Sequence, residues 1–181
     1  MYGQPIIAGA VLAITALSTV AGVYYAVPRE AHGLHWQEIA WPFPRDGWPA
    51  GRAFRCDAAT CGTETELYVR PKIGFCNCDS GVADDDEVDR VADLDLISER
   101  FTPLAPGKAV RIADMSGRLR NYHLDMSGGP RHAAVGIAVS HRCDLMVAVG
   151  AGGAGELQRA ALEFLGSHEM HHWMMAALGG G

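Results

Sequence analysis

Histidine and methionine side chains are concentrated in residues 167–175, and both kinds of side chain can bind metal ions. His168 and His172 are four residues apart, which places them on one face of a helix at a spacing that chelates a metal. His171 adds a third imidazole and Met170 a thioether sulfur, a combination that suits copper as well as zinc. These four residues are therefore candidate metal ligands. A hydrogen-bonded place in a helical core would also suit His168.

The same residues contain the pattern His-Glu-x-x-His, with Glu169 following the first histidine. In zinc hydrolases with this pattern the two histidines bind zinc and the glutamate activates water. A third metal ligand is also needed, and residues 173–181 contain no His, Asp or Glu. That ligand would have to come from an earlier residue such as Glu163. A zinc hydrolase is therefore our third hypothesis, and we assign no catalytic residue.

The five cysteines, Cys56, Cys61, Cys76, Cys78 and Cys143, predict disulfides in an oxidising compartment. Cys56 and Cys61 flank a candidate hairpin, so their pairing is easy. A bridge between Cys76 and Cys78 would close a small strained ring, so one of them is expected to reach elsewhere. Cys143 is expected to be buried or bridged. In the cytoplasm the first four could instead hold zinc, although the single residue between Cys76 and Cys78 is a poor spacing for that metal.

Carboxylates are concentrated in residues 79–95, and clustered carboxylate oxygens are the ligands that calcium ions require. The run lacks the spacing and the central glycine of an EF-hand loop. We expect a solvated acidic turn here that caps a short helix ending at Arg90, followed by an alternating strand at 92–97.

Residues 5–27 contain no charged side chain. As a helix they would rise about 35 Å, enough to cross the hydrocarbon core of a bilayer. Residues 1–4 carry no Lys or Arg, so the usual basic start of a signal peptide is missing. We expect residues 1–27 to form a transmembrane anchor or, alternatively, a cleaved signal segment. The cysteines favour an extracytoplasmic, periplasmic position for the residues that follow.

Residues 28–51 combine tryptophans with prolines and show little periodicity. Trp36, Trp41 and Trp48 lie in this segment, and each proline forces extended or turn backbone on the residue before it. We expect a linker whose aromatic side chains pack on the following domain. The alternative is a surface that docks on a membrane interface or on a partner.

Residues 52–181 have the pattern of an α+β domain. Strands are expected at 52–56, 63–70, 109–113, 118–124, 132–140 and 143–149. The last two form a hairpin around His141 and Arg142. Helices are expected at 156–165 and 170–178. The expected fold is therefore a single transmembrane helix followed by an antiparallel sheet that is covered by one or two C-terminal helices.

The order of elements from about Phe101 to Ser167 resembles the Mog1/PsbP-like fold, which includes small bacterial lipoproteins of the DcrB type. The matching order is a strand, a strand that contains Gly117-Arg118, the hairpin through His141, and a closing helix. The chain departs from the DcrB type because no lipobox cysteine ends its apolar segment. Proteins of this fold are mostly accessory or assembly factors, so the resemblance implies a fold more than a reaction.

The net charge of −6 argues against a nucleic-acid partner, whose phosphates would require a basic face. Our main hypothesis is a membrane-anchored, extracytoplasmic accessory, assembly or interaction subunit of a membrane protein complex, without enzymatic activity. Its partners would be the membrane and another membrane protein. The alternative is a protein that handles copper or zinc through the cluster of His168, Met170, His171 and His172.

Overall fold

The computed structural model describes residues 35–74, 77–126, 132–153 and 155–179. Residues 5–27, where we expect a transmembrane helix, lie outside these ranges. Within them, no helix has the length and apolar character needed to cross a bilayer.

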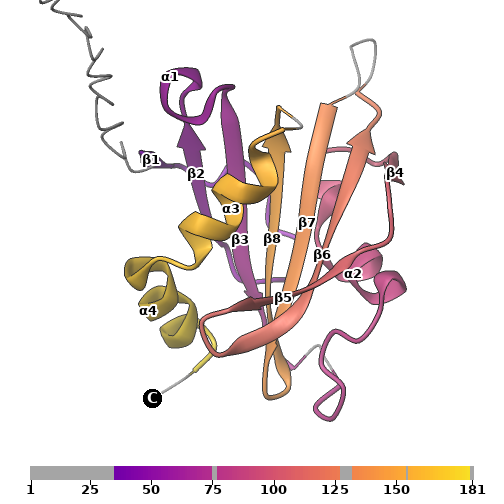
Figure 1. The fold of residues 1–181 in the computed structure, drawn as a ribbon. Coiled ribbons are helices and arrows are strands. Elements are labelled where there is room, and N and C mark those ends of the chain that lie inside the picture. The colour runs from indigo at the N-terminus through magenta and orange to yellow at the C-terminus, as the bar shows by residue number, and fades with distance from the viewer. Residues whose placement is uncertain (1–34, 75–76, 127–131, 154, 180–181) are drawn as a thin grey trace, which may run out of the picture. The chain divides into compact units, whose positions relative to one another are not determined.

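A single antiparallel sheet organises the described part of the chain (Figure 1). Its strands follow the order β1-β2-β3-β8-β7-β6-β4, and β5 pairs with β6 beside this path. The strands are β1 (Trp36–Ile39), β2 (Arg52–Cys56), β3 (Thr65–Lys72), β4 (Phe101–Pro103), β5 (Lys108–Ile112), β6 (Met115–Leu124), β7 (His132–His141) and β8 (Asp144–Gly152). The prediction of an α+β fold built on an antiparallel sheet is confirmed.

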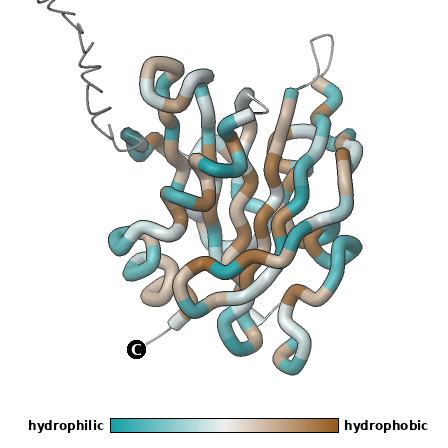
Figure 2. Tube along the Cα trace, viewed as in Figure 1, coloured by the Kyte–Doolittle hydropathy of each residue, from teal (hydrophilic) through white to brown (hydrophobic). Residues whose placement is uncertain are grey.

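Two helices cover one face of the sheet. Helix α3 (Leu157–Leu165) directs Leu157, Ala161 and Leu165 toward the sheet, because these residues are four apart and share one helical face. Helix α4 (His168–Ala177) follows after Ser167, whose side-chain oxygen accepts a hydrogen bond from the Met170 amide. Figure 1 shows both helices in front of the sheet, and Figure 2 shows hydrophobic residues along the strands.

The opposite face is covered by α2 (Asp85–Val91) and a 3-10 turn, η1 (Leu94–Leu96). Asp84 caps α2 by accepting a hydrogen bond from the Glu87 amide, as the acidic turn predicted. The prediction of a strand at 92–97 is wrong. Asp93 adopts a left-handed backbone with φ of 61°, which interrupts extended structure, and η1 follows it.

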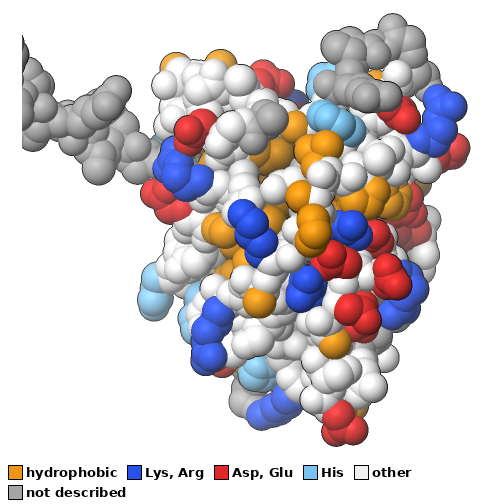
Figure 3. All heavy atoms as spheres, turned by 45° about the vertical axis from the view of Figure 1, so that its right-hand side comes forward, with side chains coloured by type: hydrophobic (Ala, Val, Ile, Leu, Met, Phe, Trp, Pro, Cys, Tyr) orange, Lys and Arg blue, Asp and Glu red, His pale blue; other side chains and the backbone are white. Residues whose placement is uncertain are grey.

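The acidic run is only partly solvated, because α2 turns carboxylates toward cations on β6. Arg118 and Arg120 lie on one face of β6, since alternate strand residues point the same way. Arg118 Nε donates to Asp85 Oδ1 at 2.9 Å, and Arg120 Nη1 donates to Asp89 Oδ2 at 2.7 Å. A backbone hydrogen bond from Gly107 and the bond from Arg118 hold the pKa of Asp85 below its usual value. Figure 3 shows acidic and basic side chains next to one another on this side of the molecule.

We expected the domain to start at Arg52, but the sheet already begins at Trp36, the first residue of β1. Strand β1 pairs with β2, with Trp36 opposite Cys56. Trp36 also stacks on Phe164 of α3 with their ring centroids 4.9 Å apart. Part of the expected linker is therefore an edge strand of the sheet.

Two disulfides join described residues. Cys56 is bonded to Cys61 across the short helix α1 (Ala58–Cys61), which confirms the local pairing. Cys78 is bonded to Cys143, which lies in the turn between β7 and β8. Cys56, Cys61 and Cys78 therefore have no free thiolate for the alternative zinc site, and Cys76 lies outside the described residues.

Candidate functional site

The connection from β1 to β2, residues 40–51, crosses one face of the sheet, and we call it the strap. It contains Pro42, Pro44 and Pro49, which explains why it has no regular secondary structure. Trp41 and Phe43 pack on Tyr68 of β3, with ring centroids 6.1 Å and 4.7 Å from the Tyr68 ring. These edge-to-face contacts fix the first half of the strap on the sheet.

A buried ion cluster fixes the second half of the strap. Arg70 of β3 donates to both oxygens of Asp93, at 2.6 Å from Nε and 2.9 Å from Nη2. Its Nη1 donates to both oxygens of Asp46 on the strap, at 2.9 Å and 2.7 Å. Lys72 Nζ lies 2.6 Å from Asp93 Oδ1 and donates to the Val91 carbonyl at 2.9 Å. The cluster therefore joins the strap, strand β3 and the end of α2.

Two opposing effects act on the pKa values of this cluster. Burial alone would lower the pKa of Arg70, but its hydrogen bonds to Asp93 and Asp46 outweigh burial and raise it. Burial alone would raise the pKa of Asp46, but bonds from Arg70 and from the Trp48 amide hold it below its usual value. Both net shifts favour the charged forms, so the ion pair persists at neutral pH.

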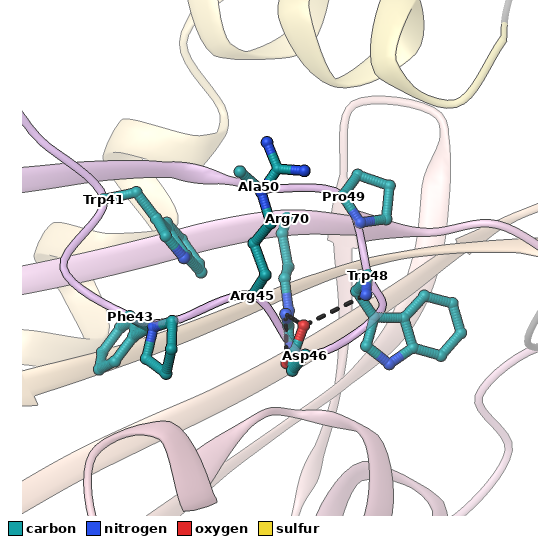
Figure 4. Close-up of a pocket in the computed structure, with 9 residues that line it drawn as sticks. Trp41, Phe43, Arg45, Asp46, Trp48, Pro49, Ala50 and Arg70 are labelled. Atoms are coloured by element: carbon teal, nitrogen blue, oxygen red, sulfur yellow. Dashed lines mark hydrogen bonds and ion pairs between the residues drawn. The ribbon is translucent and has the colours of Figure 1, made fainter.

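A cavity of about 260 Å³ lies at the strap, and we call it the strap pocket. Its lining residues are Trp41, Phe43, Pro44, Arg45, Asp46, Trp48, Pro49, Ala50 and Arg70. In Figure 4, Trp41 and Trp48 stand on opposite sides, Arg70 points to Asp46, and Arg45 extends away from Asp46. Arg45 is exposed, and no described acidic side chain pairs with it.

The strap pocket combines one ion pair with aromatic and proline walls. Arg70 and Asp46 neutralise one another, and the other walls are aromatic rings and prolines. Among the described residues that line the pocket, there is no cysteine, serine or histidine to serve as a nucleophile or a base. Large aromatic side chains beside an arginine are typical of interaction hot spots.

The predicted metal ligands differ in burial. Met170 is fully buried in the core under α4, whereas His168 and His172 are exposed on the outer side of the helix. His171 Nε2 lies 3.4 Å from Asp114 Oδ1, and Glu169 Oε1 lies 3.6 Å from Arg52 Nη2. Among the described residues, no three His, Cys, Asp or Glu side chains are grouped so that they could hold a metal ion.

The sequence did not predict the ion cluster of Arg70, Lys72 and Asp93 as part of a site. One signal could have found them. Arg70 and Lys72 alternate with Val69 and Pro71 in a strand that is otherwise apolar at this end. Two cations on the inward face of a buried strand require acidic partners, since an unpaired buried charge is strongly unfavourable.

Comparisons with known proteins give no relative from which a function could be transferred. No family model matches the chain, and neither a curated protein nor a solved structure matches it. The resemblance to the Mog1/PsbP-like fold therefore stays a prediction.

Replacing Gly51 by alanine is expected to destabilise the strap. A Cβ atom at this position would collide with the Val69 carbonyl oxygen and with the Trp41 ring. Overpacking of this kind costs about 1–3 kcal/mol of unfolding free energy, which urea denaturation would measure. Gly155→Ala is the matched control, because a Cβ there meets open space. Equal stability of the two variants would contradict the close contact.

Acidification is expected to release the Asp46–Arg70 pair. The pKa of Asp46 is lower in the folded protein than in the unfolded chain, where it is about 4. The ionised Asp46 therefore stabilises the fold above about pH 4, and this stabilisation is lost as the pH falls through the pKa that Asp46 has in the folded protein. Tryptophan fluorescence of the strap should change in this acid range. Asp46→Asn should remove that part of the change, whereas an identical acid profile for both proteins would show that the pair does not hold the strap.

Proposed function

We propose that the protein is a membrane-anchored, extracytoplasmic interaction subunit of a membrane protein complex, and that the strap pocket is its docking surface. The observation that carries this proposal is the composition of the pocket. Its walls are Trp41, Trp48 and prolines, its inner charges are already paired, and one exposed cation, Arg45, remains at its rim. Such a surface binds without carrying out a reaction.

The position of the strap in the sequence supports a role beside a membrane. The apolar segment 5–27 has the length of a transmembrane helix. Thirteen residues, 28–40, lead from it to Trp41, and a fully extended chain of that length spans at most about 45 Å. The strap is thus the first large aromatic surface to follow the proposed anchor.

The two disulfides support an extracytoplasmic position for the domain. Structural disulfides persist in oxidising compartments and are rare in reducing ones. Cys56–Cys61 and Cys78–Cys143 join parts of the sheet and its turns. This support concerns the compartment and leaves the partner open.

Site-specific photocrosslinking in cells tests the proposal. A photoreactive residue would replace Pro44, which is exposed at the strap pocket, and Ala59, exposed on α1, would be the matched control position. We expect crosslinks to a membrane component from position 44 and few from position 59. We also expect the full chain to stay in the membrane fraction after alkaline extraction. Release of the intact chain by alkali would overturn the anchoring, and equal crosslinking from both positions would overturn the docking surface.

A further inference from the structure

We infer that the disulfide between Cys78 and Cys143 is a redox site, at which an external dithiol exchanges with the Cys78 sulfur, and that its reduction releases one wall of a surface cavity. The wall consists of residues 77–83, and we call it the wall segment. The inference goes beyond the proposed function, because it requires neither a membrane anchor nor a docked partner.

The two disulfides differ in their access to solvent. Cys56 and Cys61 are 0% and 4% exposed, and they pack against Trp36 and against Ala160 of α3. Cys78 is exposed, and its partner is half-buried in the turn between β7 and β8. Thiol–disulfide exchange begins when a thiolate reaches one of the two sulfurs, so access decides which bridge reacts. The bridge at Cys78 is therefore the reactive one.

A dithiol exchanges with this bridge in two steps. Its first thiolate attacks Sγ of Cys78, the exposed member of the pair, and a mixed disulfide forms. The electron pair of the broken S–S bond stays on Sγ of Cys143, which then takes up a proton. The second thiolate of the dithiol attacks the dithiol's other sulfur in the mixed disulfide and displaces Cys78 as a thiolate, which is protonated in turn. The dithiol loses two electrons and two protons, and the two cysteines gain them.

The turn that carries Cys78 has hydrogen bonds that run within the turn itself. The Gly81 amide donates to the Asn77 carbonyl at 2.8 Å, and the Asp79 amide donates to Asn77 Oδ1 at 2.9 Å. Neither bond joins the turn to the sheet. The disulfide is the covalent tie between this turn and the hairpin of β7 and β8. After reduction, the turn would be held against the hairpin by packing, such as the close approach of Gly81 to Ser140.

The end of the wall segment that leads to α2 stays attached when the bridge is reduced. Val82 is 6% exposed and belongs to the hydrophobic cluster that contains Leu145 of β8. The Ala83 amide donates to Glu87 Oε2 of α2 at 3.1 Å. The strands themselves are joined by backbone pairing, which does not depend on the bridge. Reduction is therefore expected to loosen residues 77–81 and to leave the sheet in place.

The wall segment forms one side of a second surface cavity of about 400 Å³. Ser80, Val82 and Ala83 line the cavity from the wall segment, and residues of β5, β6 and β7 line the other sides. Cys78 lies two positions before Ser80 in the same turn. The redox state of the bridge thus determines how firmly this side of the cavity is held.

Thiol mapping under native conditions tests the exchange on the full chain. Free thiols are first blocked with N-ethylmaleimide. The folded protein is then treated with dithiothreitol or, separately, with reduced thioredoxin at the same concentration. New thiols are labelled with iodoacetamide and located by peptide mass spectrometry. The faster of the two reagents identifies a small or a protein dithiol as the reductant.

We expect labels on Cys78 and Cys143 to appear at least about tenfold faster than labels on Cys56 and Cys61, because a buried bridge reacts only after local opening. Equal rates for the two bridges, or earlier reduction of the buried bridge, would overturn the inference. Reduced glutathione, a monothiol, tests the point of attack when its mixed disulfide is trapped early with acid. We expect the adduct on Cys78, and an adduct on Cys143 alone would show that the attacked sulfur is the other one.

Hydrogen exchange tests the release of the wall segment. In the parent protein, dithiothreitol should speed exchange in peptides that cover residues 77–83 by about tenfold or more, and peptides from β7 should be unchanged. A double serine replacement at Cys78 and Cys143 should give fast exchange with and without the reductant. The matched double replacement at Cys56 and Cys61 should retain the response. Unchanged exchange of residues 77–83 after reduction of the parent protein would show that the bridge does not hold the wall.

Discussion

Replacing Asp93 by asparagine is expected to lower the free energy of unfolding by about 3–5 kcal/mol, the usual cost of removing one partner from a buried ion cluster. Asp93 is 7% exposed and bonds to both Arg70 and Lys72, which are themselves buried. Without its charge, Arg70 would keep its ion pair with Asp46, and Lys72 would lose the carboxylate that lies 2.6 Å from its Nζ. Chemical denaturation followed by far-ultraviolet circular dichroism would measure the loss.

Asparagine is the informative replacement because it keeps the shape of the side chain and tolerates the left-handed backbone at φ 61°. Any loss of stability then reports on the charge. Asp95→Asn, at an exposed position two residues away, is the matched control and should change stability by less than about 0.5 kcal/mol. If Asp93→Asn were as stable as this control, the ion cluster would not hold the fold together.

Removing the disulfide between Cys78 and Cys143 by a double serine replacement is expected to cost about 4 kcal/mol, because the loss of chain entropy on closing a loop grows with loop length. These cysteines are separated by 65 positions in the sequence. The double replacement avoids leaving either thiol free to exchange with Cys76. Thermal unfolding of the variant and the parent protein under identical oxidising conditions would give the difference.

The second disulfide provides an internal comparison. Cys56 and Cys61 are separated by only five positions, so the same entropy argument gives about 2 kcal/mol for their double serine variant. We expect the Cys78–Cys143 variant to be the less stable of the two. The reverse order would indicate that local packing near Trp36 and Ala160, which surround the short bridge, outweighs loop entropy.

The sequence predicted those parts of the fold that have a clear local period. The hairpin of β7 and β8 and the amphipathic helix α3 were predicted because their hydrophobic periods are close to 2 and 3.6 residues. The segment 92–97 alternates just as regularly, yet it forms a 3-10 turn. Its conformation is decided by Asp93, whose partners Arg70 and Lys72 are about twenty residues away along the chain. No local pattern contains that information.

The candidate site was harder to predict, because it depends on which segments meet. The tryptophans of residues 28–51 were predicted either to pack on the domain or to form a docking surface. The structure shows packing for Trp36, and the docking role stays a proposal. Trp36 belongs to a strand and packs on α3, whereas Trp41 and Trp48 line the strap pocket. The predicted metal site stays a prediction, and the structure adds that Met170 is buried whereas His168 and His172 are exposed.

The pairing of β3 with β8 has a consequence for how the chain folds during synthesis. Leu67 lies opposite Gly150, so the central strands meet only after about four fifths of the chain has been made. Until then β1, β2 and β3 form a fragment whose apolar edge strand has no neighbour, and such an edge is prone to aggregation. A chain exported while it is still being elongated would therefore complete its sheet on the far side of the membrane. Contacts between residues so distant in sequence also make for slow folding.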